Sequence, residues 1–171
     1  MPYLETRLLA EGGREAEVGE PGELLLRGPQ TFAGYWRDPA HTAEVVDGDG
    51  WLHTGDLAAR DADGAYRICG RRKEMYISGG ENVFPGEVEA ALADCAGVMQ
   101  AVVVGVPDAK WGEVGRAFVV ARPGHALSEG ELLAQARLRL AGYKVPKRVV
   151  LLDALPLLGS GKPDRRVLAT L

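Results

Sequence analysis

The sequence predicts an α+β protein, in which a β-rich segment precedes a compact unit of helices and strands. Before Gly70, short apolar and β-branched runs alternate with turns that are rich in Gly and Pro. After Gly70, apolar residues recur at helical spacing in two segments, and β-branched runs lie between these segments. We therefore expect two domains, residues 1–72 and 73–171, with the boundary near "GRRKE" and a short central sheet in the second domain.

The first domain is expected to consist of four short strands without a helix. The runs "YLETRLLA" and "GELLLRG" precede "WLHTGDLAARD" and "AYRICG", and the dipeptide Asp63–Gly64 between the last two indicates a hairpin. Some seventy residues of short strands are too few to close a hydrophobic core of their own. We therefore interpret this segment as part of a larger domain.

The second domain is expected to contain three helices. The first, "PGEVEAALADC", begins at Pro85, and the second, "LLAQARLRL", follows a capping box of Ser128 and Glu131. Pro163 opens a short third helix. One face of the first helix is apolar and comprises Val88, Ala91, Leu92 and Cys95. The runs "AVVVGV", "RAFVVAR" and "RVVLLDAL" predict strands of a buried sheet.

Composition and charge limit the classes of function. The two cysteines, Cys69 and Cys95, have no metal-ligand spacing, so the sequence supports neither a zinc site nor a disulfide framework. It contains no apolar window of membrane-spanning length, and its opening "MPYLETRLLAEGG" has acids where a signal peptide would be apolar. We therefore expect a cytoplasmic protein without a metal site of its own.

Charge is distributed unevenly along the chain. The net charge of −4 argues against general nucleic-acid binding. Residues 1–64 contain 13 acids and 5 bases, whereas residues 137–166 contain 8 bases and 2 acids. A local basic region on an acidic protein suits a small polyanion such as a nucleotide. A solvated basic helix face is the alternative interpretation.

Four stretches carry residues that suit nucleotide chemistry. "GWLHTGD" ends in a carboxylate that can accept hydrogen bonds from vicinal hydroxyls. "GRRKEMYISGGENVFPGEVE" places four charges before two glycines, which allow close approach of a ligand, and "AGYKVPKR" combines an aromatic ring with lysines. "GSGKPDRR" carries Lys162 on a glycine-rich, flexible stretch. It is not a P-loop, because Pro156 and Pro163 occupy positions where that motif has Gly and Ser or Thr.

In this order, the stretches resemble the adenylate-forming superfamily of acyl-CoA and aryl-CoA synthetases, luciferases and peptide-synthetase adenylation domains. The resemblance covers nearly the whole chain and implies that residues 1–72 are the C-terminal β-subdomain of a large AMP-binding domain. Residues 73–171 would be its mobile lid. The stretch "SGGENVFPGEVE" is more similar to the CoA ligases than to the peptide synthetases, which implies thioester formation with CoA.

The resemblance also implies a role for each matching residue toward ATP. Asp56 would hold the ribose hydroxyls, and Arg71 would support the same sugar and the phosphate. Lys73 matches the hinge about which the lid turns between two half-reactions. Lys162 matches the catalytic lysine, which bridges the substrate carboxylate and the α-phosphate as charge builds during adenylation.

A second group of residues would bind CoA. Gly79 and Gly80 would line the pantetheine tunnel, where a side chain would obstruct it. Trp111 matches an aromatic residue along the pantetheine arm, and Tyr143 and Lys147 match a stretch that contacts the CoA nucleotide. For Trp111 and Tyr143, packing at the surface is the alternative.

Two motifs of the superfamily are missing from the sequence, the phosphate loop of the type "SGTTGxPK" and the Y-G-x-T-E segment that meets adenine and magnesium. The sequence therefore predicts the C-terminal part of an AMP-forming acid:CoA ligase. This ligase would use ATP, CoA and Mg²⁺ and activate a carboxylic acid. The chain alone is expected to be inactive without the large N-terminal domain. Two alternatives are a free-standing module that binds CoA or complements a separate chain, and a fragment of a peptide-synthetase adenylation domain.

Overall fold

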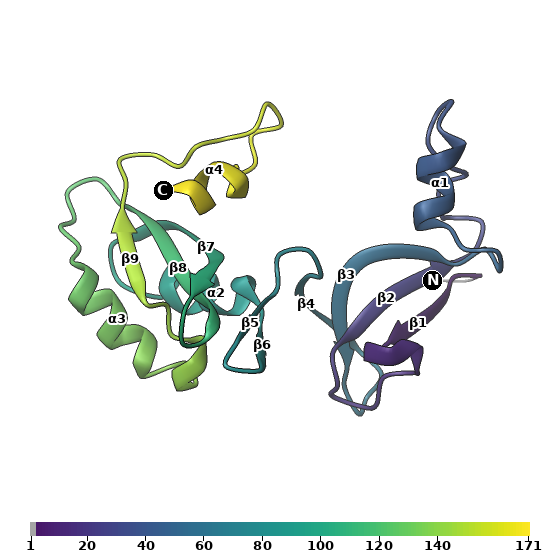
Figure 1. Ribbon diagram of the computed structural model, residues 1–171, viewed down its shortest axis with the longest axis horizontal. Helices are drawn as coiled ribbons and strands as arrows, with labels where there is room; N and C mark the ends of the chain where they lie inside the picture. Colours follow the sequence, from purple (N-terminus) through teal and green to yellow (C-terminus); the bar gives the residue numbers. More distant parts are fainter. Residues whose placement is uncertain (1–2) are drawn as a thin grey trace. The chain divides into compact units, whose positions relative to one another are not determined.

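The computed structural model describes residues 3–171, which form two compact units that divide between Lys73 and Glu74 (Figure 1). The first unit contains a four-stranded antiparallel sheet in the order β1-β2-β3-β4. All four predicted strands are confirmed, and their bounds are β1 Glu5–Leu9, β2 Gly22–Arg27, β3 Leu52–Arg60 and β4 Tyr66–Arg71. The predicted hairpin also joins β3 to β4, with Gly64 at a φ of +88° in its loop.

The expectation that the first domain has no helix is wrong. Besides a single 3₁₀ turn, η1 (Glu11–Gly13), it contains the seven-residue helix α1 (Pro39–Val45). The Asp38 side chain caps this helix by accepting the His41 N–H at 3.0 Å, and Pro39 starts the helix with a suitable φ. None of its residues is buried, so the helix has no apolar stripe that sequence periodicity could detect.

The second unit is built on a five-stranded sheet in the order β6-β5-β8-β7, and β9 also pairs with β8. All pairs are antiparallel except β8 with β9. The strands are β5 Tyr76–Ser78, β6 Glu81–Val83, β7 Val98–Asp108, β8 Gly112–Ala121 and β9 Arg148–Leu151. The last three confirm the predicted buried runs, and the whole chain is α+β as predicted.

Helices α2 (Pro85–Ala93) and α3 (Glu129–Arg137) pack on one face of this sheet, and α4 (Arg165–Thr170) packs on the other. Successive residues of β7 alternate between the two faces, so that the strand contributes to both apolar clusters. The cluster under α2 and α3 includes Val88, Leu92, Val103, Val119, Leu132 and Ala136. The cluster under α4 includes Val102, Val104, Phe118, Val120 and Leu168.

The predicted helices of the second domain are confirmed, with corrections at their ends. The apolar face of α2 is buried as expected. The Ser128 hydroxyl caps α3 by accepting the Glu131 N–H at 3.3 Å, and it donates to the Glu131 carboxylate at 2.7 Å. Helix α3 ends at Arg137, before the predicted end, and α4 begins at Arg165 with Asp164 as its cap. None of the helices within residues 3–171 has the length and apolar content needed to cross a membrane.

Tyr76 holds β5 against the centre of the second sheet. Its side chain is 2% exposed and lies over Gly105 and Gly115, which face each other across β7 and β8. A Cβ at either glycine would overlap Tyr76, so the pair provides the space that the ring fills. Its hydroxyl has no hydrogen-bond partner within residues 3–171. Burial and the nearby Glu113 carboxylate raise the pKa of Tyr76 far above its ordinary value.

Candidate functional site

The predicted ribose ligand Asp56 lies in a bulge of β3. The pairing of β2 and β3 shifts at this point, so that three residues of β3, 54–56, lie opposite a single residue of β2, Leu24. Gly55 has a φ of +71°, which glycine adopts without steric strain. The Thr54 hydroxyl donates to the Leu24 carbonyl at 2.7 Å and accepts the Asp56 N–H at 3.1 Å. The bulge is therefore held by specific hydrogen bonds.

Asp56 and Arg71, both predicted to contact ATP, face each other across β3 and β4. The Arg71 Nε lies 2.7 Å from the Asp56 Oδ1, and its Nη1 donates to the Thr54 carbonyl at 3.1 Å. The Arg71 side chain is more than half exposed, and that of Asp56 is about one third exposed. The ion pair engages one carboxylate oxygen, which leaves the other as an acceptor for a ligand hydroxyl. Lys73, the predicted hinge residue, is exposed and ends the first unit.

Gly79 and Gly80 form the two-residue turn between β5 and β6. Their φ values of +63° and +91° are typical of a type I′ hairpin turn, which requires positive φ at both positions. A Cβ at Gly79 would lie 2.8 Å from the ring of Trp111, whereas a Cβ at Gly80 meets no atom within 4 Å. The Gly79 N–H donates to the Trp111 carbonyl at 2.9 Å. The structure therefore brings Gly79 and Trp111 together.

Trp111 also contacts two lysines. The ammonium groups of Lys110 and Lys147 lie 4.8 and 5.5 Å from its ring centroid. The Asp108 carboxylate accepts the N–H groups of Trp111 and Lys110, each at 2.9 Å, and these bonds hold the pKa of Asp108 below its usual value. Trp111 remains 38% exposed, so an aromatic surface with adjacent positive charge is open to a ligand.

Tyr143 lies in the 3₁₀ turn η2 (Gly142–Lys144) and is 39% exposed. The Lys144 ammonium lies 5.7 Å from its ring centroid and donates to both carboxylate oxygens of Glu87, at 2.7 and 2.8 Å. The ion pair fixes this turn to the start of α2. Lys144 is therefore engaged with the protein, whereas Lys147 lies beside Trp111.

Lys162 follows the loop of a tight β-hairpin between β9 and α4. Leu157 pairs with Pro163, the Leu158 N–H donates to the Lys162 carbonyl at 2.8 Å, and the Gly161 N–H donates to the Leu158 carbonyl at 2.8 Å. Gly161 has a φ of +79°, as in three-residue hairpin loops. The segment is therefore a hydrogen-bonded turn rather than the open, flexible stretch that its composition suggests. The Lys162 side chain is exposed at this turn.

Arg165, which the sequence analysis did not single out, fixes this hairpin to the rest of the second unit. Its guanidinium lies 3.1 Å from the Glu74 carboxylate and 2.9 Å from the Glu89 carboxylate, and it donates to the Val103 carbonyl at 2.6 Å. Arg165 begins α4, so these bonds join that helix to α2, β7 and the first residue of the second unit. In the sequence, the two adjacent arginines of "PDRR" were the feature that could have indicated this role.

The two groups of candidate residues in the second unit lie far apart. Figure 1 shows the loop before α4, which carries Lys162, at the opposite end of this unit from the β5–β6 hairpin, whose turn carries Gly79 and Gly80. The sequence had placed both groups in one domain without indicating their separation. Within residues 3–171, no group of three or more His, Cys, Asp or Glu side chains could hold a metal ion.

Comparison with known proteins identifies relatives of this arrangement. The sequence profile of the AMP-binding enzyme C-terminal domain matches residues 87–162. A feruloyl-CoA synthase from Amycolatopsis is 49% identical over 160 residues, which are 94% of this chain and 32% of that protein. A medium/long-chain-fatty-acid–CoA ligase from Mycobacterium tuberculosis is 45% identical over 171 aligned residues, covering 96% of this chain and 30% of that protein.

Solved structures agree with these sequence matches. The o-succinylbenzoate CoA synthetase from Bacillus subtilis, in complex with an acyl-adenylate intermediate, aligns with a TM-score of 0.91 and 36% identity. The alignment covers 98% of this chain and 34% of that one. This chain thus spans about a third of the length of the relatives that it matches, and it corresponds to their C-terminal portion.

Proposed function

Because the chain belongs to the adenylate-forming superfamily, as the C-terminal portion of its acyl-CoA and aryl-CoA ligases, we propose that it serves both half-reactions of an AMP-forming acid:CoA ligase. In the first, a carboxylate attacks the α-phosphate of ATP, and pyrophosphate leaves. In the second, the CoA thiol attacks the acyl-adenylate, and AMP leaves. Residues 1–72 are assigned to the end of the large AMP-binding domain and residues 73–171 to the lid. The rest of the large domain is the partner that both steps require.

Lys162 is the catalytic residue of the first half-reaction in this proposal. Its ammonium would contact the substrate carboxylate and the α-phosphate, where negative charge builds in the transition state. The hairpin fixes the lysine backbone, so only the side chain loses conformational freedom when it meets the phosphate. The free carboxylate oxygen of Asp56 would accept the ribose hydroxyls, and Arg71 would support the sugar and phosphate.

Gly79, Gly80, Trp111, Tyr143 and Lys147 would bind CoA in the second half-reaction. The Trp111 ring offers apolar surface to the pantetheine arm, and the Lys147 ammonium beside it suits a phosphate of the nucleotide. The superfamily also uses Mg²⁺. The described residues offer no cluster of ligands for this ion, so we assign the chain no part in holding it.

The observation that carries the proposal is the separation of Lys162 from the β5–β6 turn within one unit (Figure 1). A rigid unit with these two groups at opposite ends can present only one of them to a common reaction centre at a time. Rotation of the lid about Lys73 would exchange them between the half-reactions. The acid itself is not assigned, because relatives of similar identity are named for feruloyl and fatty-acid substrates.

Separate assays of the two half-reactions test this proposal in the complete ligase that contains this chain. Lys162→Ala is expected to slow acyl-adenylate formation about 10²- to 10³-fold while thioester formation from pre-made acyl-adenylate persists. Trp111→Ala is expected to raise the KM for CoA about tenfold and to leave adenylation intact. Arg139→Ala, which removes an exposed cation elsewhere in the second unit, is the control. Normal acyl-adenylate formation by Lys162→Ala would overturn the proposal.

A second candidate function, a free-standing CoA-binding module, is favoured by one observation. Gly79, Trp111 and Lys147 meet within the second unit, so their contacts to a ligand need no residue of the first. Calorimetry of the chain alone with CoA separates the candidates. Micromolar binding that Trp111→Ala weakens about tenfold supports the module. Absence of binding, together with AMP formation only after addition of the large domain, supports the ligase part.

A further inference from the structure

Glu23 is a buried carboxylate beside the bulge that presents Asp56. Within residues 3–171, Glu23 and Ser78 are the buried polar residues, and Glu23 is the charged one. Burying a carboxylate is costly unless charged or hydrogen-bonding partners compensate for the loss of water. The partners of Glu23 therefore show what its position holds together.

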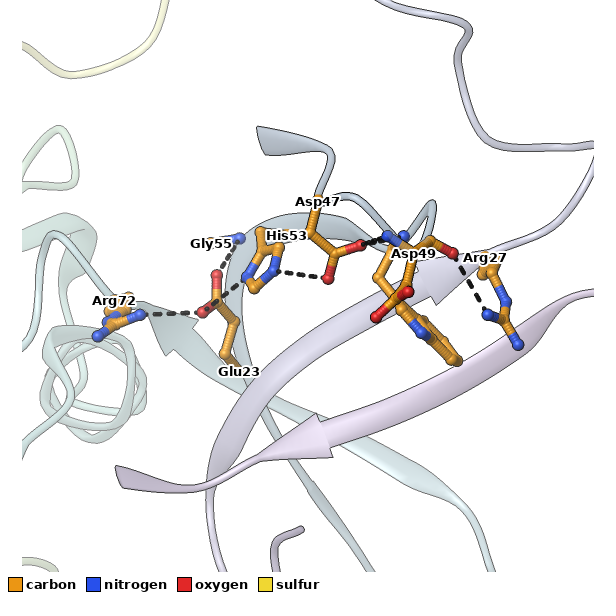
Figure 2. Close-up of polar contacts among 8 residues, drawn as sticks. Glu23, Arg27, Asp47, Asp49, His53, Gly55 and Arg72 are labelled. Atoms are coloured by element: carbon orange, nitrogen blue, oxygen red, sulfur yellow. Dashed lines mark hydrogen bonds and ion pairs between the residues drawn. The ribbon is translucent and has the colours of Figure 1, made fainter. Parts of the chain in front are cut away.

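These partners come from the Asp56 bulge and from the end of the first unit (Figure 2). The Glu23 Oε1 accepts the Gly55 N–H at 3.2 Å, and the Oε2 lies 2.9 Å from the Arg72 Nη1. The Arg72 N–H in turn donates to the Gly55 carbonyl at 2.9 Å. Glu23, Gly55 and Arg72 thus form a closed ring of contacts directly beside Asp56, and Arg72 precedes Lys73.

His53 extends this ring toward a second carboxylate. Its Nδ1 lies 3.5 Å from the Glu23 Oε2, and its Nε2 lies 3.6 Å from the Asp47 Oδ2 (Figure 2). The other Asp47 oxygen accepts the N–H groups of Trp51 and Asp49, at 2.9 and 3.0 Å. These backbone bonds lower the pKa of Asp47 and hold the turn before β3 in place.

The two partners of the Glu23–Arg72 ion pair differ in their exposure to solvent. Its side chain is 67% exposed, whereas that of Glu23 is 10% exposed. Arg72 would lose little by turning to water, but Glu23 would then remain buried with a weaker set of partners. The need of Glu23 for compensation therefore holds Arg72 against the bulge.

We propose that Glu23 is a positioning residue that joins the nucleotide-binding bulge to the chain entering the hinge. The inference rests on the proposed function. Through its bond to the Gly55 N–H, Glu23 sets the direction of Asp56. Through its ion pair with Arg72, Glu23 fixes the last residue before Lys73. Rotation of the lid then begins at Lys73 and does not extend back into β4. The ion pair thus defines the N-terminal limit of the hinge.

Substitutions that remove only the ion pair, compared with Glu23→Ala, which also removes the acceptor of the Gly55 N–H, separate these roles. Glu23→Gln keeps an oxygen that can accept the Gly55 N–H but removes the charge that holds Arg72, and Arg72→Met removes the same ion pair from its exposed side. Both variants are expected to keep the KM for ATP within about twofold and to change the rate of thioester formation by about fivefold or more. The double variant is expected to resemble either single variant, because all three lack the same pair. Glu23→Ala is expected to raise the KM for ATP about tenfold as well.

Hydrogen exchange of the complete ligase that contains this chain provides a readout that does not depend on activity. Amide exchange at Gly55 is expected to accelerate about tenfold or more in Glu23→Ala, and exchange at Val103 in the second unit is expected to stay unchanged. If Glu23→Ala does not fold, Glu23→Gln and Arg72→Met are compared at the Arg72 amide, where both are expected to increase exchange.

The outcomes distinguish this inference from the proposed function. Unchanged exchange at Gly55 and Arg72 in all variants would overturn the positioning role, whether or not the chain serves a ligase. A second outcome is altered exchange in the Glu23 and Arg72 variants with normal kinetics of both half-reactions. If Lys162→Ala still inactivates the ligase, this outcome would overturn only the link between Glu23 and the hinge. Additive effects of Glu23→Gln and Arg72→Met would likewise contradict action through one ion pair.

Discussion

Gly79 and Gly80 occupy adjacent positions in one turn, yet a side chain would have different consequences at each. Both have positive φ, so any substitution introduces backbone strain. At Gly79, a Cβ would also collide with Trp111, whereas Gly80 has open space around it. Sequence reasoning named both glycines as the lining of a tunnel. The structure adds that Gly79 first has to accommodate Trp111 of its own chain.

We therefore predict that Gly79→Ala displaces the Trp111 ring and Gly80→Ala does not. The overlap of 2.8 Å at Gly79 is too short for an ordinary Cβ contact, so the ring has to move. The ¹⁵N NMR resonance of the Trp111 indole is expected to shift in Gly79→Ala and to stay in place in Gly80→Ala. Both variants carry a similar backbone cost of about 1 kcal/mol, which makes each the control of the other. Equal shifts in both would show that backbone strain, and not contact with the ring, governs Trp111.

Secondary-structure elements were predictable where apolar residues recur at helical spacing or form an unbroken β-branched run. Helix α2 has an apolar face at regular spacing, and the strands β7 and β8 are rich in valine, so local pattern and tertiary packing agree. The predictions of helices were wrong where a local hydrogen bond determines whether a helix forms and where it begins. Pro163 pairs with Leu157 in the Lys162 hairpin, so Asp164 becomes the cap of α4. Helix α1 depends on the Asp38 cap and buries none of its residues.

Strand β5 offers a test of packing at the scale of an element. The ring of Tyr76 fills the space over Gly105 and Gly115, but its hydroxyl has no hydrogen-bond partner within the described chain. Tyr76→Phe keeps the ring and loses no protein hydrogen bond. We therefore expect its free energy of unfolding to equal or exceed that of the wild type by up to about 1 kcal/mol.

Chemical denaturation of both proteins measures this difference, and Tyr76→Ala is the matched control. Removal of the ring leaves a cavity over the two glycines, and we expect it to lower stability by about 3–5 kcal/mol, as large-to-small core changes do. A loss of more than about 1 kcal/mol in Tyr76→Phe would show that the hydroxyl has a partner that stabilises the fold.

At the scale of the whole molecule, the two units differ in the extent of the hydrophobic core that each one encloses. The sheet of the second unit has an apolar cluster on each face, and helices contribute to both clusters. The first unit has a single four-stranded sheet, and several of its large apolar side chains are exposed, including Trp36 at 86% and Ile68 at 57%. Exposed aromatic and aliphatic groups of this size are typical of a surface that another part of a protein covers.

We predict that the isolated fragment 74–171 folds by itself and that the fragment 1–73 does not. The first is expected to unfold cooperatively in calorimetry, because both faces of its sheet are covered. The second is expected to show no cooperative transition, since one short sheet buries too little apolar area. A fragment 74–171 with weak near-ultraviolet dichroism and no cooperative transition would contradict this expectation.

The sequence by itself determined the α+β class, most of the strands and helices, and the residue types that resemble an adenylate-forming enzyme, because these depend on local periodicity and on short motifs. Only the tertiary structure decided which of these residues meet. It joined Asp56 to Arg71, Trp111 to Gly79, and Glu23 to Arg72, which lie 15, 32 and 49 positions apart. Such contacts follow from strand register, bulges and turns, since a shift of one residue in a strand turns every side chain to the other face.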